Sequence, residues 1–369
     1  MNKELYIGLM SGTSLDGIDA VLTEITKGEV KLVASQSYII PEEIKQQVLD
    51  VCLGQDTNLK QLGELDHQLG HLYANAVLTL LKQTGVSKDS VTAIGNHGQT
   101  VFHQPNSDTP FTIQLGDANI IAAQTGITTI ADFRRKDIAL GGQGAPLVPA
   151  FHEALFGSKK VTTVVLNIGG IANISVLRPQ YPVIGYDTGP GNMLMDAWCT
   201  QYKHLPYDEN AFFAQQGQVN IPLLNALLTE PYLALPPPKS TGRELFNLTW
   251  LEQILRSHSC QPEDVQRTLC EFTARTISHE VEKYQQNKQQ KLLVCGGGAK
   301  NPLLMKRLDE LLPLWSVNPT DSEGIDSQNI EAMAFAWLAY RRIHNLPSNL
   351  PQVTGASRLA SLGVIYFAD

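Results

Sequence analysis

Two segments far apart in the chain share one pattern, which consists of a strand, a turn of small residues and a second strand. They are residues 7–22, IGLMSGTSLDGIDAVL, and residues 166–177, LNIGGIANISVL. Apolar runs on both sides of a glycine-containing turn are typical of a β-hairpin. Because one hairpin comes near the start of each half of the chain, the pattern predicts two lobes of duplicated architecture that face each other across a cleft.

The remaining periodicity predicts strands that alternate with helices, which indicates the α/β fold class. We expect strands at residues 5–10, 18–25, 92–95, 112–115, 127–131, 161–168, 172–177, 183–186 and 292–295. We expect helices at residues 62–81, 118–124, 192–202, 221–228, 263–284 and 328–343, and another that begins at Pro302. Asp117 is expected to cap the second of these helices, and Gly126 to stop it.

The length of 369 residues also favours two lobes, since an ordinary domain has about 150 residues. We expect the first lobe to contain residues 1–132 and 345–369, so that the end of the chain returns to it. The second lobe is expected to contain residues 133–344. Within it, residues 205–242 include three consecutive prolines and are predicted to form an irregular insertion.

The composition excludes several classes of protein. Apolar residues make up 43% of the chain and charged residues 17%, which excludes a disordered protein. The net charge of −8 gives no overall attraction to nucleic acid or to anionic lipid. No apolar run approaches the length of a membrane span, and the five cysteines lack the spacing of a disulfide framework or a zinc site. We therefore expect a globular protein of the cytoplasm.

The turn of the first hairpin brings hydroxyls, glycines and carboxylates together, in the order Gly12, Thr13, Ser14, Leu15, Asp16, Gly17, Ile18 and Asp19. Glycines let successive backbone N–H groups point at one anion, and hydroxyls add donors. Asp16 and Asp19 would repel a bare phosphate. They suit Mg²⁺, which is bound by a few carboxylates, water and phosphate oxygens. A tight β-turn with polar tips is the alternative explanation.

Two further glycine-rich turns follow strands in the second half of the chain. One contains Asn167, Gly169 and Gly170, and the other is Gly296-Gly297-Gly298 before a helix. Bare backbone at such places admits a flat base or a ribose, or a phosphate against the helix N-terminus. Three glycine-rich strand ends together predict a nucleotide held between the two lobes.

The sequence YDTGPGN at residues 186–192 predicts a sharp turn from a strand into a helix, with Asp187 at the strand end. Such a turn would project the carboxylate into a cleft where packing shapes its pKa, so Asp187 is the candidate general base. Alternatively, Asp187 caps the following helix or orders the turn. Polar residues also gather at 95–100, 132–137 and 141–144.

These motifs together resemble the anhydro-N-acetylmuramic acid kinase family. The resemblance rests on residues 12–19, GNHGQTVFHQP at 95–105, DFRRKDIALGGQGAPLVP at 132–149, NIGGIANIS at 167–175, YDTGPGNMLMD at 186–196 and CGGGAKNP at 295–302. It implies the two-lobed fold of sugar kinases, actin and chaperone ATPases, with ATP in the cleft. It also implies a transferase that phosphorylates an alcohol group with Mg²⁺ and ATP.

The implied reaction is hydrolytic opening of the bridge in 1,6-anhydro-N-acetylmuramic acid with phosphorylation of O6. It gives N-acetylmuramic acid 6-phosphate and ADP, in peptidoglycan recycling and amino-sugar catabolism. By the same resemblance, Asp187 would deprotonate the attacking water, and the glycine-rich turns would hold the nucleotide, with Asp16 and Asp19 acting on Mg²⁺. The implied sugar contacts are His97, Gln99, Arg134 or Arg135, and Glu331. An arginine suits the lactyl carboxylate, because its fork binds two oxygens. A homodimer is also implied.

Two alternatives remain at the level of sequence. An ordinary sugar kinase of the same fold would use Asp187 to deprotonate a sugar hydroxyl instead of a water. An actin-like or chaperone-like ATPase would use the nucleotide to switch a binding surface or to polymerise. The polar run at residues 132–144 argues against the ATPase, because a small-molecule site needs convergent polar groups and a polymer interface does not.

Overall fold

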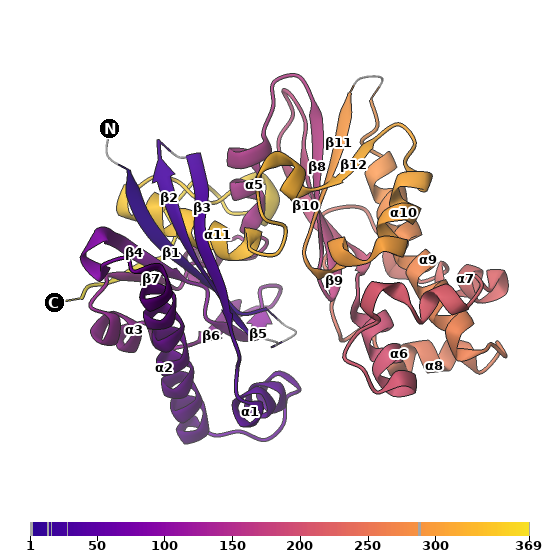
Figure 1. The fold of residues 1–369 in the computed structure, drawn as a ribbon, viewed down its shortest axis with the longest axis horizontal. Helices are drawn as coiled ribbons and strands as arrows, with labels where there is room; N and C mark the ends of the chain where they lie inside the picture. The colour runs from indigo at the N-terminus through magenta and orange to yellow at the C-terminus, as the bar shows by residue number, and fades with distance from the viewer. Residues whose placement is uncertain (1–2, 13–14, 16, 28, 287–288, 369) are drawn as a thin grey trace. The chain divides into compact units, whose positions relative to one another are not determined.

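The computed structural model describes residues 3–12, 15, 17–27, 29–286 and 289–368, and Figure 1 shows its fold. The chain divides into two compact units: unit 1 is Met1–Leu155 with Asn329–Asp369, and unit 2 is Phe156–Gln328. Both units combine a β-sheet with helices, which confirms the predicted α/β class. No helix among the described residues is both long and apolar enough to cross a bilayer.

The elements of unit 1 are β1 (Glu4–Met10), β2 (Ile18–Thr26), β3 (Glu29–Tyr38), α1 (Glu42–Cys52), α2 (Leu59–Thr84), β4 (Val91–Asn96), β5 (Gln99–Gln104), β6 (Phe111–Leu115), α3 (Ala118–Thr125), β7 (Thr129–Ala131), α4 (Arg135–Ala139), α5 (Val148–Phe156, which ends at the boundary), α11 (Ile330–Ile343), α12 (Pro351–Thr354) and β13 (Val364–Tyr366). Those of unit 2 are β8 (Thr162–Ile168), β9 (Ile171–Leu177), β10 (Ile184–Pro190), α6 (Met193–Lys203), α7 (Ile221–Leu227), α8 (Leu248–Leu255), α9 (Pro262–Glu282), β11 (Gln290–Cys295), α10 (Pro302–Leu311) and β12 (Ser316–Pro319).

Five strands of the six-stranded sheet in unit 1 have the same topology as the five-stranded sheet in unit 2. In unit 1, β1 pairs antiparallel with β2, which pairs antiparallel with β3, while β4 and then β7 continue the sheet in parallel on the other side of β1. In unit 2, β8, β9, β10, β11 and β12 repeat this arrangement strand for strand. The duplicated lobes predicted from the two hairpins are therefore confirmed.

The unit boundaries differ from the expected ones at 132/133 and 344/345. Residues 133–155 and α11 belong to unit 1. For α11, the reason lies at two glycines in neighbouring strands: a Cβ on Gly8 would lie 1.9 Å from the carbonyl oxygen of Ala332, and one on Gly95 would lie 2.0 Å from that of Phe335. Because neither glycine has a side chain, α11 packs directly on β1 and β4. As expected, the end of the chain lies in unit 1, where β13 pairs with β7.

Local capping follows the sequence closely. Asn58 and Gln61 form a capping box at the start of α2, and Gly85 ends that helix in the left-handed conformation. Asp117 caps α3, and Gly126 ends it, as predicted. In β1, Ile7 and Leu9 belong to the apolar cluster that includes α2. Because alternate residues of a strand face opposite sides of the sheet, α2 and α11 cover different faces of it.

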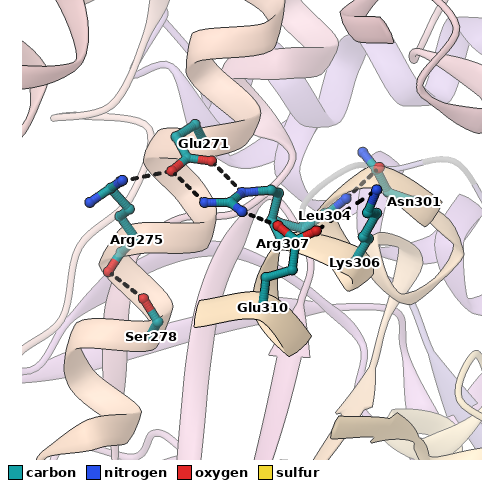
Figure 2. A network of polar contacts seen from close by, with 8 residues as sticks. All are labelled: Glu271, Arg275, Ser278, Asn301, Leu304, Lys306, Arg307 and Glu310. Carbon is teal, nitrogen blue, oxygen red and sulfur yellow. Dashed lines mark hydrogen bonds and ion pairs between the residues drawn. The ribbon is translucent and has the colours of Figure 1, made fainter. Parts of the chain in front are cut away.

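A buried carboxylate fixes two helices of unit 2 (Figure 2). Glu271 of α9 is 4% exposed at its side chain and accepts hydrogen bonds from Arg275 of the same helix and from Arg307 of α10. Arg307 also pairs with Glu310. Burial opposes ionisation of Glu271, but the two guanidiniums outweigh it and lower the pKa of Glu271. The ion pair holds α10 against α9.

Candidate active site

Asp187 lies inside β10 and not at a strand end, so that part of the prediction is wrong. In the pairing of β10 with β9, Asp187 faces Asn173 and Gly189 faces Ala172, so the register shifts between them. Thr188 is the extra residue, and its hydroxyl donates to the carbonyl of Ala172 at 3.1 Å. Such a β-bulge redirects side chains next to it. The glycines after Asp187 indicate a turn, but pairing continues as far as Pro190.

The carboxylate of Asp187 is held through one of its two oxygens. The hydroxyl of Ser240 donates to Oδ2 at 2.9 Å, and the backbone N–H of Thr241 donates to the same atom at 3.0 Å. Among the described residues, none donates a hydrogen bond to Oδ1. Asp187 does not cap α6, which begins after Asn192 without a side-chain cap. The carboxylate instead orders residues 240–241, at the end of the segment expected to be an irregular insertion.

The environment of Asp187 changes its acidity. Burial raises the pKa of its carboxyl group, and the charge of Glu244 adds to this. The hydrogen bonds from Thr241 and Ser240 act in the opposite direction, because they stabilise the charged form, but they do not cancel the effect of burial. A half-buried carboxylate with a raised pKa, and with one oxygen to which no described residue donates, can accept a proton from a small nucleophile.

A second polar cluster lies in unit 1, where Arg134 contacts His97. Nε and Nη2 of Arg134 lie 3.3 and 2.8 Å from Nε2 of His97, and Nη1 donates to the carbonyl of Gly144 at 2.9 Å. Burial lowers the pKa of Arg134 to about 10, although the charges of Glu331 and Asp137 oppose this. The guanidinium stays protonated at neutral pH, so this cluster presents a fixed cation.

Arg135 has different surroundings from Arg134. Its side chain is 65% exposed and pairs with Asp132, which raises the pKa of Arg135. The sequence offered either arginine as a ligand for the substrate. The structure places only Arg134 next to His97.

Asp137 holds the loop that Arg134 contacts. It is fully buried, and its carboxylate accepts hydrogen bonds from the backbone N–H of Gly144 at 2.9 Å, from Thr354 at 2.9 Å and from Asn349 at 3.0 Å. A Cβ on Gly142 would lie 2.3 Å from the same carboxylate. Sequence reasoning placed Asp137 in a polar run without giving it a role, because its partners come from the distant C-terminal segment.

The other predicted sugar contacts also belong to unit 1. Gln99 is buried at the start of β5, where its side-chain oxygen accepts a hydrogen bond from Ser11 at 2.7 Å. Glu331, in the first turn of α11, interacts electrostatically with Arg134 and Asp19. Burial raises the pKa of Glu331, Arg134 lowers it and Asp19 raises it. Glu331 therefore faces the polar cluster and does not serve only the helix dipole.

The first glycine-rich turn is described in part. Leu15 has φ +57° and is buried at 2% exposure, and its N–H donates to the carbonyl of Gly12 at 3.3 Å. This backbone conformation is uncommon for a residue with a side chain. Thr13, Ser14 and Asp16 lie outside the described residues. Ile18 and Asp19 begin β2, where Asp19 accepts a hydrogen bond from Ser37 of β3.

The glycine-rich turns of unit 2 meet at the start of α6. The N–H of Gly191 donates to the carbonyl of Gly170, and that of Asn192 to the carbonyl of Gly169, each at 2.8 Å. Asn192 also donates from its side chain to the carbonyl of Ile168, the last residue of β8. Asn167 precedes Ile168, and β11 pairs with β8 beside it. The second and third predicted turns are thus neighbours in one unit.

Glycine is favoured for different physical reasons at different positions in these turns. A Cβ on Gly298 would lie 2.3 Å from Cγ2 of Ile168, and Gly296 has φ +79°. Packing therefore favours glycine at 298, and the backbone conformation favours it at 296. A Cβ on Gly169, Gly170 or Gly297 would have no atom nearer than 3.6 Å among the described residues that are not its chain neighbours. Packing within the protein therefore does not require glycine at these three positions, and their bare backbone permits close approach by a flat or charged ligand.

Of the two residues predicted to act on Mg²⁺, Asp19 is among the described residues and Asp16 is not. In the described part of the chain, no three or more histidine, cysteine, aspartate or glutamate side chains are grouped so that they could hold a metal. Mg²⁺ in a nucleotide complex needs only one or two carboxylates, with water and phosphate oxygens as its other ligands. Asp19, next to a turn of small residues, has the chemistry for this.

The chain closely resembles proteins of one kind. A family model for anhydro-N-acetylmuramic acid kinase matches residues 4–368. A protein of that name from Vibrio vulnificus strain YJ016 is 65% identical over 364 residues, which cover 99% of this chain and 98% of the relative. Another from Vibrio cholerae is 63% identical over 367 residues, which cover 100% of this chain and 99% of the relative.

Similarity to solved structures is more distant. An activator of the 2-hydroxyisocaproyl-CoA dehydratase from Clostridium difficile with bound ADPNP has a TM-score of 0.45 and 12% identity. The match covers 93% of this chain and 96% of that chain. The family assignment therefore depends on the sequence relatives.

Proposed function

The chain belongs to the anhydro-N-acetylmuramic acid kinase family, and we propose that it phosphorylates 1,6-anhydro-N-acetylmuramic acid at O6 while water opens the anhydro bridge. The products are N-acetylmuramic acid 6-phosphate and ADP, and the place of the reaction is peptidoglycan recycling in the cytoplasm. The observation that carries the mechanism is the carboxylate of Asp187, which is held through Oδ2 by two donors while no described residue donates to Oδ1.

Asp187 acts as the general base in this proposal. Oδ1 accepts a proton from a water molecule as the oxygen of that water forms a bond to C1 of the sugar. The bond from C1 to O6 breaks, and O6 takes the γ-phosphoryl group as the bond from the γ-phosphorus to the bridging oxygen of ADP breaks. The proton passes from Asp187 to solvent. O6 leaves C1 as a nucleophile, so no separate base on O6 is needed.

Arg134 and His97 recognise the sugar in this proposal, together with Gln99 and Glu331. The three hydrogen bonds of Arg134 use three of its five N–H groups, so among the described residues two remain for the lactyl carboxylate of the substrate. Arg135 is not proposed for this role, because it is engaged with Asp132 at an exposed position.

The nucleotide contacts in this proposal come from the glycine-rich turns. Gly169, Gly170 and Gly297 are open to close approach, which supports contact with ATP. The turn from Gly12 to Asp19 would hold phosphates, and Asp19 would face Mg²⁺; Asp16 is proposed with it from sequence alone. Mg²⁺, when bound, offsets the charge of the phosphate oxygens. We also propose a homodimer, from the family resemblance.

The proposal is tested by ADP release from the purified chain with Mg²⁺-ATP. We expect release to depend on 1,6-anhydro-N-acetylmuramic acid, with N-acetylmuramic acid and N-acetylglucosamine as unbridged controls. Release with an unbridged sugar but not with the bridged one would identify an ordinary sugar kinase. Release that rises with protein concentration and responds to no sugar would identify an ATPase switch.

A further inference from the structure

A fully buried ion pair lies close to Asp187 and has no part in the reaction described so far. Nζ of Lys239 lies 2.8 Å from Oε1 of Glu280 in α9, and each side chain is 2% exposed. Nζ also donates to the carbonyl of Leu233 at 3.0 Å and lies 5.1 Å above the ring centre of Tyr232. All these residues belong to unit 2.

Glu280 is also held through its second oxygen. The hydroxyl of Tyr186 donates to Oε2 at 2.9 Å, and Nζ of Lys283 donates to it at 2.7 Å. Tyr284 donates to the hydroxyl of Tyr186, which completes the chain of bonds. Burial opposes ionisation of Glu280, but the bonds from Lys239 and Lys283 outweigh it and lower its pKa.

This network contacts the backbone of Asp187 and includes the residue before it. Tyr186 precedes Asp187 in β10, and the carbonyl of Lys239 accepts a hydrogen bond from the N–H of Asp187 at 3.1 Å. The hydroxyl of Tyr232 donates to the carbonyl of Asp187 at 2.8 Å. Ser240 and Thr241, which hold the carboxylate, directly follow Lys239 in the chain. The side chain of Lys239 therefore anchors the backbone that supplies both donors.

Stability alone does not account for such an arrangement. Two charges lose their hydration when they are buried, and a well-packed apolar pair of the same size is often as stable or more stable. A buried ion pair whose two partners also bond to other groups does connect the segments that carry them. The two donors to Oδ2 of Asp187 depend on the position of residues 240 and 241, which lie in a segment without regular secondary structure.

We propose that Lys239 and Glu280 are positioning residues, which fix residues 239–241 so that Ser240 and Thr241 hold Oδ2 of Asp187 and leave Oδ1 for the water. The inference rests on the role of Asp187 in the proposed function. Neither Lys239 nor Glu280 touches the substrate in this account. Loss of the pair releases the segment, which weakens the two donors and moves the carboxylate.

Several titratable groups surround Asp187 and bear on its acidity. Glu244 raises the pKa of Asp187, while Ser240 and Thr241 lower it. The other charged or titratable side chains of the network are Lys239, Glu280, Lys283, Tyr186, Tyr232 and Tyr284, with Arg178 over the ring of Tyr284. Weaker hydrogen bonds to Oδ2 remove stabilisation of the anion, so the pKa of Asp187 rises when the pair is lost.

The test replaces both partners together, as Lys239→Met with Glu280→Gln, so that no unpaired charge stays buried. We expect kcat to fall by about 10²-fold, because small displacements of a reacting group cost that much. The KM values for sugar and ATP should change by less than about threefold, and the acid limb of the profile of kcat against pH should move to higher pH.

A matched control removes a different ion pair of unit 2, in which the carboxylate is buried and the arginine half-buried, as Glu271→Gln with Arg307→Met (Figure 2). This variant should lower the melting temperature but leave kcat and the acid limb unchanged. If the Lys239 and Glu280 variant behaves like the control, the pair is structural only and the proposal is overturned.

A second variant is added in case the double variant is unstable, and a second readout is added that does not depend on turnover. Ser240→Ala changes an exposed residue and removes one donor to Oδ2. The carboxyl carbon of Asp187 can be followed by NMR in ¹³C-aspartate-labelled protein and identified by its loss in Asp187→Asn. Both Ser240→Ala and the double variant should titrate at higher pH than the wild type.

An unchanged titration in either variant contradicts the positioning role, even if the protein proves to act on no sugar. A wild-type protein without sugar-dependent turnover, but with the expected titration shifts, contradicts the proposed function alone. The two failures are therefore distinguishable.

Discussion

Nη2 of Arg134 lies 2.8 Å from Nε2 of His97. A guanidinium can only donate, so His97 accepts this bond as a neutral imidazole with its proton on Nδ1. Burial lowers the pKa of His97 well below its usual range, and the charge of Arg134 adds to this. The pair therefore keeps one charge across the physiological pH range, and that charge belongs to Arg134.

This pairing predicts different effects for the two neighbouring arginines. Arg134→Ala removes a partly buried cation and should raise the KM for 1,6-anhydro-N-acetylmuramic acid by at least about tenfold, as expected for one charge-assisted hydrogen bond. Arg135→Ala removes an exposed guanidinium that pairs with Asp132 and should change KM by less than about twofold. Steady-state kinetics of both variants provide the check. Equal and negligible effects would show that the carboxylate is bound elsewhere.

Asp187→Asn should abolish turnover and preserve binding. An amide can still accept from Ser240 and Thr241 at the position of Oδ2, but it cannot take a proton from water. We expect kcat to fall by several orders of magnitude, with sugar and ATP binding retained in calorimetry. A variant with a near-normal kcat would remove Asp187 from the role of base.

Asp187→Asn should also make the stability of the folded protein less dependent on pH. Because the pKa of Asp187 is raised in the folded protein, the folded state retains this proton to higher pH than the unfolded state. Its contribution to stability is fully present below the unfolded pKa and is lost as pH rises through the folded pKa. The melting temperature of Asp187→Asn, relative to wild type, should therefore rise between acidic and neutral pH. A constant difference between the two proteins across that interval would contradict the raised pKa.

Substitutions at two adjacent glycines should separate an effect on nucleotide binding from an effect on packing. Gly297 is exposed, and the nearest atom to a Cβ there would be Nδ2 of Asn192 at 3.6 Å. Gly297→Ala should therefore fold normally, and it should raise the KM for ATP. Gly298→Ala would collide with Ile168 and should lower stability by about 1–3 kcal/mol. Thermal melting and ATP kinetics of the two variants distinguish these effects. An unchanged ATP KM in Gly297→Ala would place the nucleotide away from this turn.

Sequence patterns located most of the elements that hold the site. The two hairpins predicted the duplicated sheets, and the long apolar periodicity predicted α2, α9 and α11. β3 was not predicted, because Val30 is its only buried residue and the others alternate between exposed and half-buried positions. β12 was missed as well, since it is short and holds no fully buried residue. Edge strands of this kind carry a weak hydrophobic signal.

Motifs pointed to Asp187 and to the pair Arg134 and Arg135 as candidates, but they did not distinguish the two arginines or predict the contacts around these residues. Ser240 and Thr241 are more than 50 residues from Asp187 in the chain, and Asn349 is more than 200 from Asp137. No local spacing predicts such contacts, which arise only when the sheet and its helices have packed. Likewise, Lys239 follows three prolines in the segment predicted to be an irregular insertion. Nothing in that pattern indicates that its side chain is buried against Glu280.

The measurement that tests the central claim most directly is the mass of the sugar product formed in ¹⁸O-labelled water. The protein is incubated with Mg²⁺-ATP and 1,6-anhydro-N-acetylmuramic acid, with Asp187→Asn as the control. We predict a 6-phosphorylated product that carries one heavy oxygen at C1, and none from the control. A phosphorylated product that keeps its bridge and carries no label would contradict coupled ring opening, and with it the role of Asp187 as the base that activates water.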